Sequence, residues 1–424
     1  MKLALLRFQV RFSYKVANFV GLVSGFVVGQ GSIFIVNSYL IFNQDYESAF
    51  TFSLYFSIAT LLITLCECGS IQILARHGVD SLSQDEKNIH FDEYFIYICI
   101  WRLFYTMLIL SLSLMAFSIY HDGKIANFIA AFSPALIFWS VNSAGLIDSR
   151  GASGVSGILN SIPYIAATLG LILCILYFGG LNEIVLGISM AGGYFLVVGL
   201  QTVYLLVSGS RISINTINFS IFRSAGLSTI SMMAAIAPGQ LYQRLLLLIV
   251  GGMLPVEYGA AYAYAKNLVS AASQFVGFAR RVSFPNTVRL VGPGAKSHRP
   301  SLNELFQAQT LPFYLSIALT LFVAVYGLAA ISAISAQIGL IIILFSLSIF
   351  SESVSSSVTE IVIGRGLFSR VAIVRIAAVI FGSGAAVLLI PTVGITGAFV
   401  SDITVHTTVA ILNFYIVQRW RAQL

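Results

Sequence analysis

Charged residues and cysteines are scarce in this chain. Charged side chains make up 9% of its 424 residues, whereas 58% of the residues are apolar and the mean hydropathy is +0.91. Soluble globular domains carry roughly 25% charged residues, so this composition excludes a soluble globule. The four cysteines lie in or beside apolar runs, without the spacing of a zinc site or of a secreted disulfide framework: Cys66, Cys68, Cys99 and Cys174. We expect them to behave as small apolar residues.

Signatures of catalysis are missing as well. The sequence contains no nucleotide-binding glycine loop, no low-complexity tract and no cluster with metal-ligand spacing. No stretch between the apolar runs is long enough for a separate catalytic domain. We therefore expect a protein that is not an enzyme and needs no cofactor or metal, with a coupling proton or sodium ion as the one bound species to consider.

Long apolar runs dominate instead. Twelve runs of eighteen or more residues are nearly free of charge, and a helix needs about 20 residues to cross a hydrocarbon core of ~30 Å. The first run begins near Ala17 without the small-residue cleavage site of a removable signal peptide. The sequence predicts an all-α polytopic membrane protein with about twelve transmembrane helices.

The basic residues are distributed unevenly among the loops. Nineteen Lys and Arg fall in one alternating set of loops and tails, whereas the other set holds only Lys124. Cytoplasmic loops carry such an excess, so both termini are expected in the cytoplasm. The net charge of +7 is explained by topology, and nothing indicates a nucleic-acid partner.

Two short repeats divide the chain in half. Asp45-Tyr46-Glu47 matches Glu257-Tyr258-Gly259 with a shift of 257 − 45 = 212, and Arg150-Gly151 matches Arg365-Gly366 with a shift of 365 − 150 = 215. Such a repeat predicts two six-helix bundles around a central cavity. The expected order is a cytoplasmic amino-terminal segment, a first bundle, a cytoplasmic linker, a second bundle and a cytoplasmic tail, at 1–16, 17–207, 208–223, 224–417 and 418–424.

Two cations lie inside the expected hydrocarbon slab. With helices read as 224–252 and 258–280, Arg244 and Lys266 are each eight residues from the turn, a depth of about 12 Å. Each charge costs at least about 2.5–3.5 kcal/mol there and the two repel, which an anionic ligand would explain. The alternative is structural, with buried charges holding helices together and Arg244 paired to Glu257.

Opposite charges also occur in the first half. Glu67 and Arg102 lie at similar distances from the inner loop 75–93, so hairpin geometry places them at one level, as a candidate gate pair. The other reading is that each reaches the inner interface separately.

The tenth run, 337–363, is unusually polar in its inner half, where seven serines accompany Glu352 and Glu360. This part is expected to face protein or water. In the last run, Asp402 and His406 are four residues apart and share one helix face. These four titratable side chains are candidates for coupling to a proton or sodium ion.

Several motifs resemble polysaccharide transporters: Gln243-Arg244 before the apolar run 245–250, Glu257-Tyr258-Gly259 followed by Tyr262, Phe284-Pro285, and Gly394-Ile395-Thr396-Gly397-Ala398. They are similar to Wzx-type flippases of lipid-linked oligosaccharides, within the MOP exporter superfamily that also holds MATE drug exporters and lipid II flippases. The likeness extends over most of the chain.

The resemblance implies alternating access in a bacterial inner membrane. An undecaprenyl-pyrophosphate-linked oligosaccharide repeat unit would move from the cytoplasmic to the outer leaflet, for O-antigen or another surface polysaccharide. Arg244 and Lys266 would bind the pyrophosphate, and Tyr242 and Tyr262 would stack on sugars unless they are packing aromatics. The partners implied are the lipid-linked substrate, the bilayer and other polysaccharide-assembly membrane proteins.

Three other classes are weighed against this one. A MATE-like antiporter of drugs with protons or sodium shares the architecture, but its cavity is expected to be acidic. A membrane-embedded polysaccharide polymerase would need a long outer loop, and the outer loops here are short. A major facilitator transporter would carry a glycine and basic pattern that the inner loop 76–90 lacks.

Overall fold

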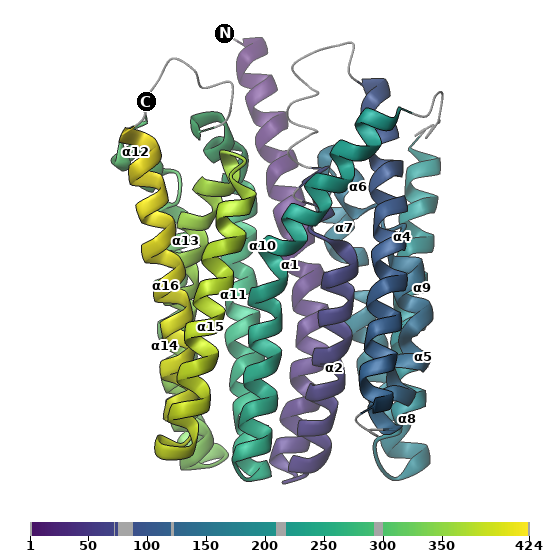
Figure 1. Ribbon diagram of the computed structural model, residues 1–424, viewed down its shortest axis with the longest axis vertical. Coiled ribbons are helices and arrows are strands. Elements are labelled where there is room, and N and C mark those ends of the chain that lie inside the picture. Colours follow the sequence, from purple (N-terminus) through teal and green to yellow (C-terminus); the bar gives the residue numbers. More distant parts are fainter. Residues whose placement is uncertain are drawn as a thin grey trace. The chain divides into compact units, whose positions relative to one another are not determined.

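The computed structural model describes residues 2–71, 73–74, 88–119, 123–208, 218–291 and 300–422. Every regular element in these ranges is a helix (Figure 1). Eleven membrane spans in the described residues are long and apolar enough to cross a bilayer. The predicted class, an all-α polytopic membrane protein, is confirmed.

Contacts divide the chain into two compact units. Unit 1 comprises Met1–Val36 and Tyr55–Met233, and unit 2 comprises Asn37–Leu54 and Ala234–Leu424. The units differ from the predicted bundle ranges because the segment 37–54 packs with unit 2 and because the later boundary falls inside a helix. The predicted bundle ranges stay a prediction, and most of the predicted linker, 209–217, lies outside the described residues.

Unit 1 is built from antiparallel helices, with α5 packed on α4 and on α9, and α8 packed on α9. Its elements are most of α1 (Lys2–Phe42) and α2 (Tyr46–Glu67), then α4 (Asn88–Ile119), α5 (Gly123–Trp139), α6 (Ala144–Ser149), α7 (Ser153–Leu159), α8 (Ile162–Phe178), α9 (Glu183–Val207) and the start of α10 (Phe219–Met253).

Glycines let α1 approach α7 at backbone distance. A methyl group added at Gly25 would lie 2.6 Å from the carbonyl carbon of Gly157, and one at Gly21 would lie 2.7 Å from the Cα of Gly154. Small residues at a spacing of four permit such contact between membrane helices.

Replacing Gly25 with alanine is expected to destabilise the protein by about 1–3 kcal/mol, because the new methyl group meets backbone that cannot move aside cheaply. Gly31 is the matched control, since it lies on the same helix and nothing approaches within 4 Å of an added Cβ. Thermal unfolding in detergent should show a lower Tm for Gly25→Ala but not for Gly31→Ala. Equal Tm values would contradict the close contact.

Unit 2 packs α14 against α11, α13 and α16, with α15 against α16 (Figure 1). Its elements are the rest of α10, then α11 (Val256–Val291), α12 (Leu302–Gln307), α13 (Thr310–Ala333), α14 (Ala336–Gly364), α15 (Phe368–Val393) and α16 (Ile395–Ala422). The predicted span that is missing from these eleven is the one at 258–280, which lies in α11; this helix has ample length at 36 residues but is less apolar than the others. The helix α10 continues through Pro238.

The repeat predicted at Arg150-Gly151 and Arg365-Gly366 recurs in backbone geometry. Both glycines adopt a φ of +87° after the last turn of a helix. In each unit the residue after the glycine donates to the carbonyl five residues back, Ala152 to Ile147 and Leu367 to Val362, at 3.1 and 3.2 Å. This is the Schellman ending, which favours glycine, so the two halves end equivalent helices in the same way.

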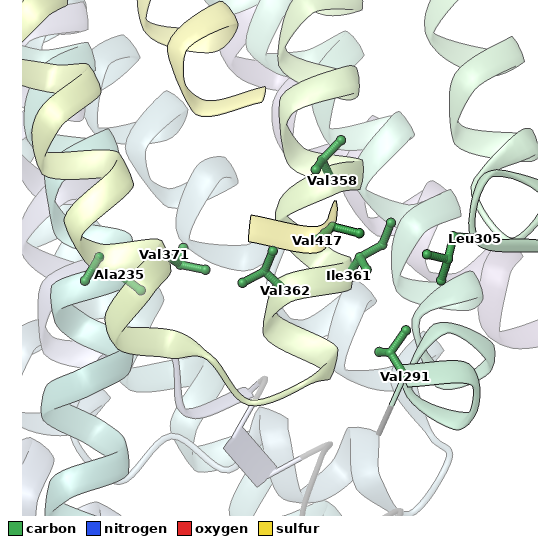
Figure 2. Close-up of a cluster of buried hydrophobic side chains, with 9 residues drawn as sticks. Ala235, Val291, Leu305, Val358, Ile361, Val362, Val371 and Val417 are labelled. Carbon is green, nitrogen blue, oxygen red and sulfur yellow. The ribbon is translucent and has the colours of Figure 1, made fainter. Parts of the chain in front are cut away.

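Apolar side chains from six helices of unit 2 meet at the carboxyl end of α14 (Figure 2). The cluster contains Ala235, Val291, Leu305, Val358, Ile361, Val362, Val371, Ala372 and Val417. Beside it, Arg365 lies over the Trp420 ring at 5.3 Å and donates to the carbonyl of Val291 at 3.2 Å. This end of the unit is therefore held largely by packed apolar groups.

Candidate functional site

Buried and partly buried polar side chains lie on three helices of unit 2. On α11 they recur every seven residues, which returns to the same helix face after two turns. We call this feature the polar column and define it as Lys266, Ser273 and Arg280 on α11, Glu352, Ser355 and Glu360 on α14, and Asp402 and His406 on α16. The serine-rich face of α14 is buried in protein, as its polarity predicts, with Ser348, Ser353 and Ser355 all buried.

Lys266 and Asp402 form the central ion pair of the column. The Lys266 ammonium donates to both carboxylate oxygens of Asp402, each at 3.1 Å. It also lies over the Phe345 ring, 5.8 Å from the centroid. The side chain of Lys266 is 17% exposed and that of Asp402 only 1%. The lysine therefore stands at the accessible side of the pair and the carboxylate behind it.

His406 lies one turn beyond Asp402 on α16. Its Nε2 atom is 4.0 Å from Oδ1 of Asp402, which confirms that the two share a helix face. Its Nδ1 atom lies 3.3 Å from the Ser355 hydroxyl on α14. Asp402 is thus flanked by a lysine and by an imidazole that can become a cation.

The two other predicted carboxylates of the column also have partners on α11. The Ser273 hydroxyl donates to Glu352 at 2.7 Å. The Arg280 guanidinium lies 3.5 Å from Glu360, which also accepts from the Gln309 side-chain amide at 3.4 Å. Each of the four predicted ion-coupling residues therefore contacts another member of the polar column. Their role in coupling stays a prediction.

Arg244 faces the same region of unit 2. Its helix, α10, ends at Met253 and α11 begins at Val256, so Arg244 precedes the turn by nine residues and Lys266 follows it by ten. The hairpin that the sequence predicts is therefore present. Asp402 and Arg244 both interact electrostatically with the Tyr262 hydroxyl. Because Asp402 also pairs with Lys266, the two predicted phosphate-binding cations lie in the neighbourhood of one carboxylate.

The two predicted sugar-stacking tyrosines are buried. Tyr242 is 3% exposed, and its hydroxyl lies 2.6 Å from that of Ser401, which in turn donates to the carbonyl of Gly382. Tyr262 is 1% exposed and packs its ring edge against Phe345. These contacts are those of packing aromatics, the second of the two roles considered, and sugar stacking by either ring stays a prediction.

In unit 1, the fully buried Arg102 supports an interrupted helix. It donates to the carbonyl of Asn142 at 2.9 Å and to that of Trp139, where α5 ends and before α6 begins. Cations stabilise the carboxyl ends of helices, where carbonyls lack helical partners. The predicted gate pair of Arg102 with Glu67 stays a prediction, and the backbone contacts give Arg102 a structural role of their own.

No direct signal in the sequence identifies the partners that meet across helices in the column. Lys266 and Asp402 are 136 residues apart, and no spacing rule connects them. The available signal was the recurrence of polar residues every seven positions on α11, because these residues contact the polar face of α14. The internal repeat does not predict these partners either, since the shift of 266 − 212 = 54 aligns Lys266 with the apolar Leu54.

Comparisons with known proteins identify the fold. No protein-family model and no curated protein matches the chain. A multidrug resistance MATE family transporter of the MOP superfamily, in its outward-facing conformation, is 13% identical over 96% of both chains with a TM-score of 0.67. The eukaryotic MATE transporter AtDTX14 is 18% identical over 97% of this chain and 96% of its own, with a TM-score of 0.58.

The lipid II flippase MurJ, in an inward closed conformation, is 13% identical over 96% of this chain and 87% of its own, with a TM-score of 0.65. These neighbours are transporters and a flippase, not enzymes, as the sequence predicts for this chain. At such low identity the likeness concerns the fold alone. The chain has the fold of MOP-superfamily transporters, in a multi-pass membrane protein.

Proposed function

We propose that this protein is a flippase for an anionic, lipid-linked oligosaccharide in the bacterial inner membrane. The observation that carries the proposal is that two cations of unit 2, Arg244 and Lys266, lie at the depth of the expected hydrocarbon slab near a single carboxylate, Asp402.

Charges in membrane helices are expensive, so an unbalanced set favours a function that supplies the missing charge. The pyrophosphate of an undecaprenyl-linked sugar is a dense anion whose lipid tail remains in the bilayer. An arginine offers it planar multi-donor contacts, and a lysine offers a point charge. The proposal includes cytoplasmic termini and delivery of the repeat unit to O-antigen or another surface polysaccharide.

A MATE-like exporter of cationic drugs is the second candidate. The ion pair of Lys266 with Asp402 favours this candidate. Arg244 and Lys266 are the two cations that favour an anionic substrate, and the pair neutralises one of them. Two assays in proteoliposomes separate the candidates. Accelerated transbilayer movement of a fluorescent lipid-pyrophosphate sugar supports the flippase, whereas gradient-driven transport of ethidium without any flipping supports the exporter and overturns the flippase.

Arg244→Ala is expected to lower flipping per folded molecule by about ten- to a hundredfold, which corresponds to one charge-assisted contact of about 1.5–3 kcal/mol. Arg244→Lys should recover only part, since a point charge cannot reproduce the guanidinium fork. The control is Arg370→Ala, which removes an exposed arginine at the start of α15. Glycan output in cells, normalised to protein in the membrane, should follow the same order. Full output from Arg244→Ala would contradict the binding role.

A further inference from the structure

The ion pair at the centre of the polar column has one accessible and one inaccessible member. Lys266 keeps 17% of its side chain exposed, whereas Asp402 keeps 1%. An incoming anion can therefore meet the ammonium but not the carboxylate. On the basis of the proposed function, we propose that Asp402 is an internal substitute for the substrate phosphate, holding Lys266 until a pyrophosphate displaces it.

The geometry of the pair suits such an exchange. Both carboxylate oxygens lie at 3.1 Å from the single ammonium nitrogen, so the contact is that of a point charge and needs no particular direction. The cation–π contact between the ammonium and the Phe345 ring does not depend on which anion binds the opposite side of the ammonium. A phosphate oxygen can therefore replace a carboxylate oxygen without rebuilding the site.

Displacement leaves Asp402 in need of another cation, because an unpaired charge at a buried position is strongly unfavourable. Among the described residues, the charged and titratable groups around it include Lys266 and Tyr262 on α11, His406 on α16, and Tyr242 and Arg244 on α10, the last through its interaction with Tyr262. Of these only His406 can become a new cation, and its Nε2 atom is already 4.0 Å away. A proton taken from solvent makes it an imidazolium that pairs with Asp402.

Substrate binding and proton uptake are thus linked. One anionic headgroup binds at Lys266 and one proton binds at His406. The proton compensates one negative charge of the headgroup. By linkage, the affinity for substrate should rise as the pH falls, because binding of the headgroup takes up a proton.

The test is isothermal titration of the full chain in nanodiscs with a short-chain prenyl pyrophosphoryl N-acetylglucosamine. Its diester pyrophosphate lacks the phosphate monoester pKa near 6, so it adds no proton of its own. Buffers of different ionisation enthalpy report the protons bound. The wild-type protein should bind the probe with uptake of up to one proton and more tightly at low pH.

Asp402→Asn should bind the probe about tenfold tighter, without proton uptake or pH dependence, because the competing charge is gone. His406→Gln should bind more weakly than wild type and also without proton uptake. Asp45→Asn, which removes an exposed carboxylate at the start of α2, is the control and should match wild type.

Failure of the inference and failure of the proposed function give different results. Wild-type binding without proton uptake, at an affinity that is constant across pH, overturns the inference and leaves the flippase standing; this measurement does not depend on any variant folding. Weaker binding by Asp402→Asn overturns it as well. No binding of the probe by wild type or any variant overturns the proposed function and the inference with it.

Discussion

Lys266→Met alone is expected to destabilise the folded protein by up to about 3–5 kcal/mol, because it removes the cation that pairs with the buried Asp402, and a proton on His406 offsets only part of that loss. Asp402 is 1% exposed and both of its oxygens accept from Lys266. The double variant Lys266→Met with Asp402→Leu should regain most of that stability, since apolar groups of similar volume often replace a buried pair at no cost. Unfolding in mixed detergent micelles measures each free energy.

The same set of variants separates stability from function. If Lys266 binds substrate, the double variant should fold like wild type yet fail to flip the lipid-linked sugar. A structural pair predicts the opposite, with normal flipping once stability is restored. A single Lys266→Met variant as stable as wild type would contradict the energetic account of the pair. Phe345→Leu controls for packing under the ammonium, and it should cost less than the loss of the charge.

The fold was predictable because its determinants are local. Apolar runs long enough to span a bilayer identify the helices without knowledge of their partners. The Arg-Gly pairs mark helix ends because glycine readily adopts positive φ, and Gly151 and Gly366 share the value of +87°. Asp402 and His406 lie on one face because four residues separate them. Each of these inferences needs only neighbours in sequence.

The candidate site was only partly predictable, because its contacts join distant helices. Sequence spacing relates Arg244 to Lys266 through a hairpin, but it cannot relate Lys266 to Asp402, 136 residues away. Arg280 and Glu360, and Ser273 and Glu352, meet for the same non-local reason. The charged residues that the sequence singles out do lie in the site. Their predicted grouping assigned Lys266 to phosphate binding and Asp402 to ion coupling, although these two residues form an ion pair.

The backbone break between α5 and α6 was hidden for a different reason. Residues 139–143 contain neither glycine nor proline, so the strongest sequence signals of an interruption are missing. The structure stabilises the break with side chains from elsewhere: Arg102 donates to two carbonyls, and Gln201 accepts from the amide of Ser143 at 3.1 Å. Irregular backbone at membrane depth is tolerated only when its polar groups are satisfied in this way.

Arg102→Leu should accordingly destabilise the protein by about 1–3 kcal/mol, since the buried carbonyl of Asn142 loses its donor, whereas that of Trp139 still accepts from the amide of Asn142 at 3.0 Å. Arg102→Lys should fall between leucine and wild type, because one ammonium cannot reproduce two guanidinium donors directed at separate carbonyls. Gln201→Leu removes the acceptor for the amide of Ser143 and should cost about 1–3 kcal/mol. The control is Arg223→Leu, at an exposed position in the same unit.

Stability and transport together separate this supporting role from gating. If Arg102 supports the break, its variants lose stability in the order leucine, lysine, wild type, while flipping per folded molecule stays constant. Hydrogen exchange should also accelerate at residues 140–144 before it does elsewhere, because their backbone groups lose donors first. A gate pair with Glu67 gives another pattern, in which Arg102→Lys folds normally and flips at an altered rate, and Glu67→Gln does the same. An Arg102→Leu variant as stable as wild type would exclude the supporting role.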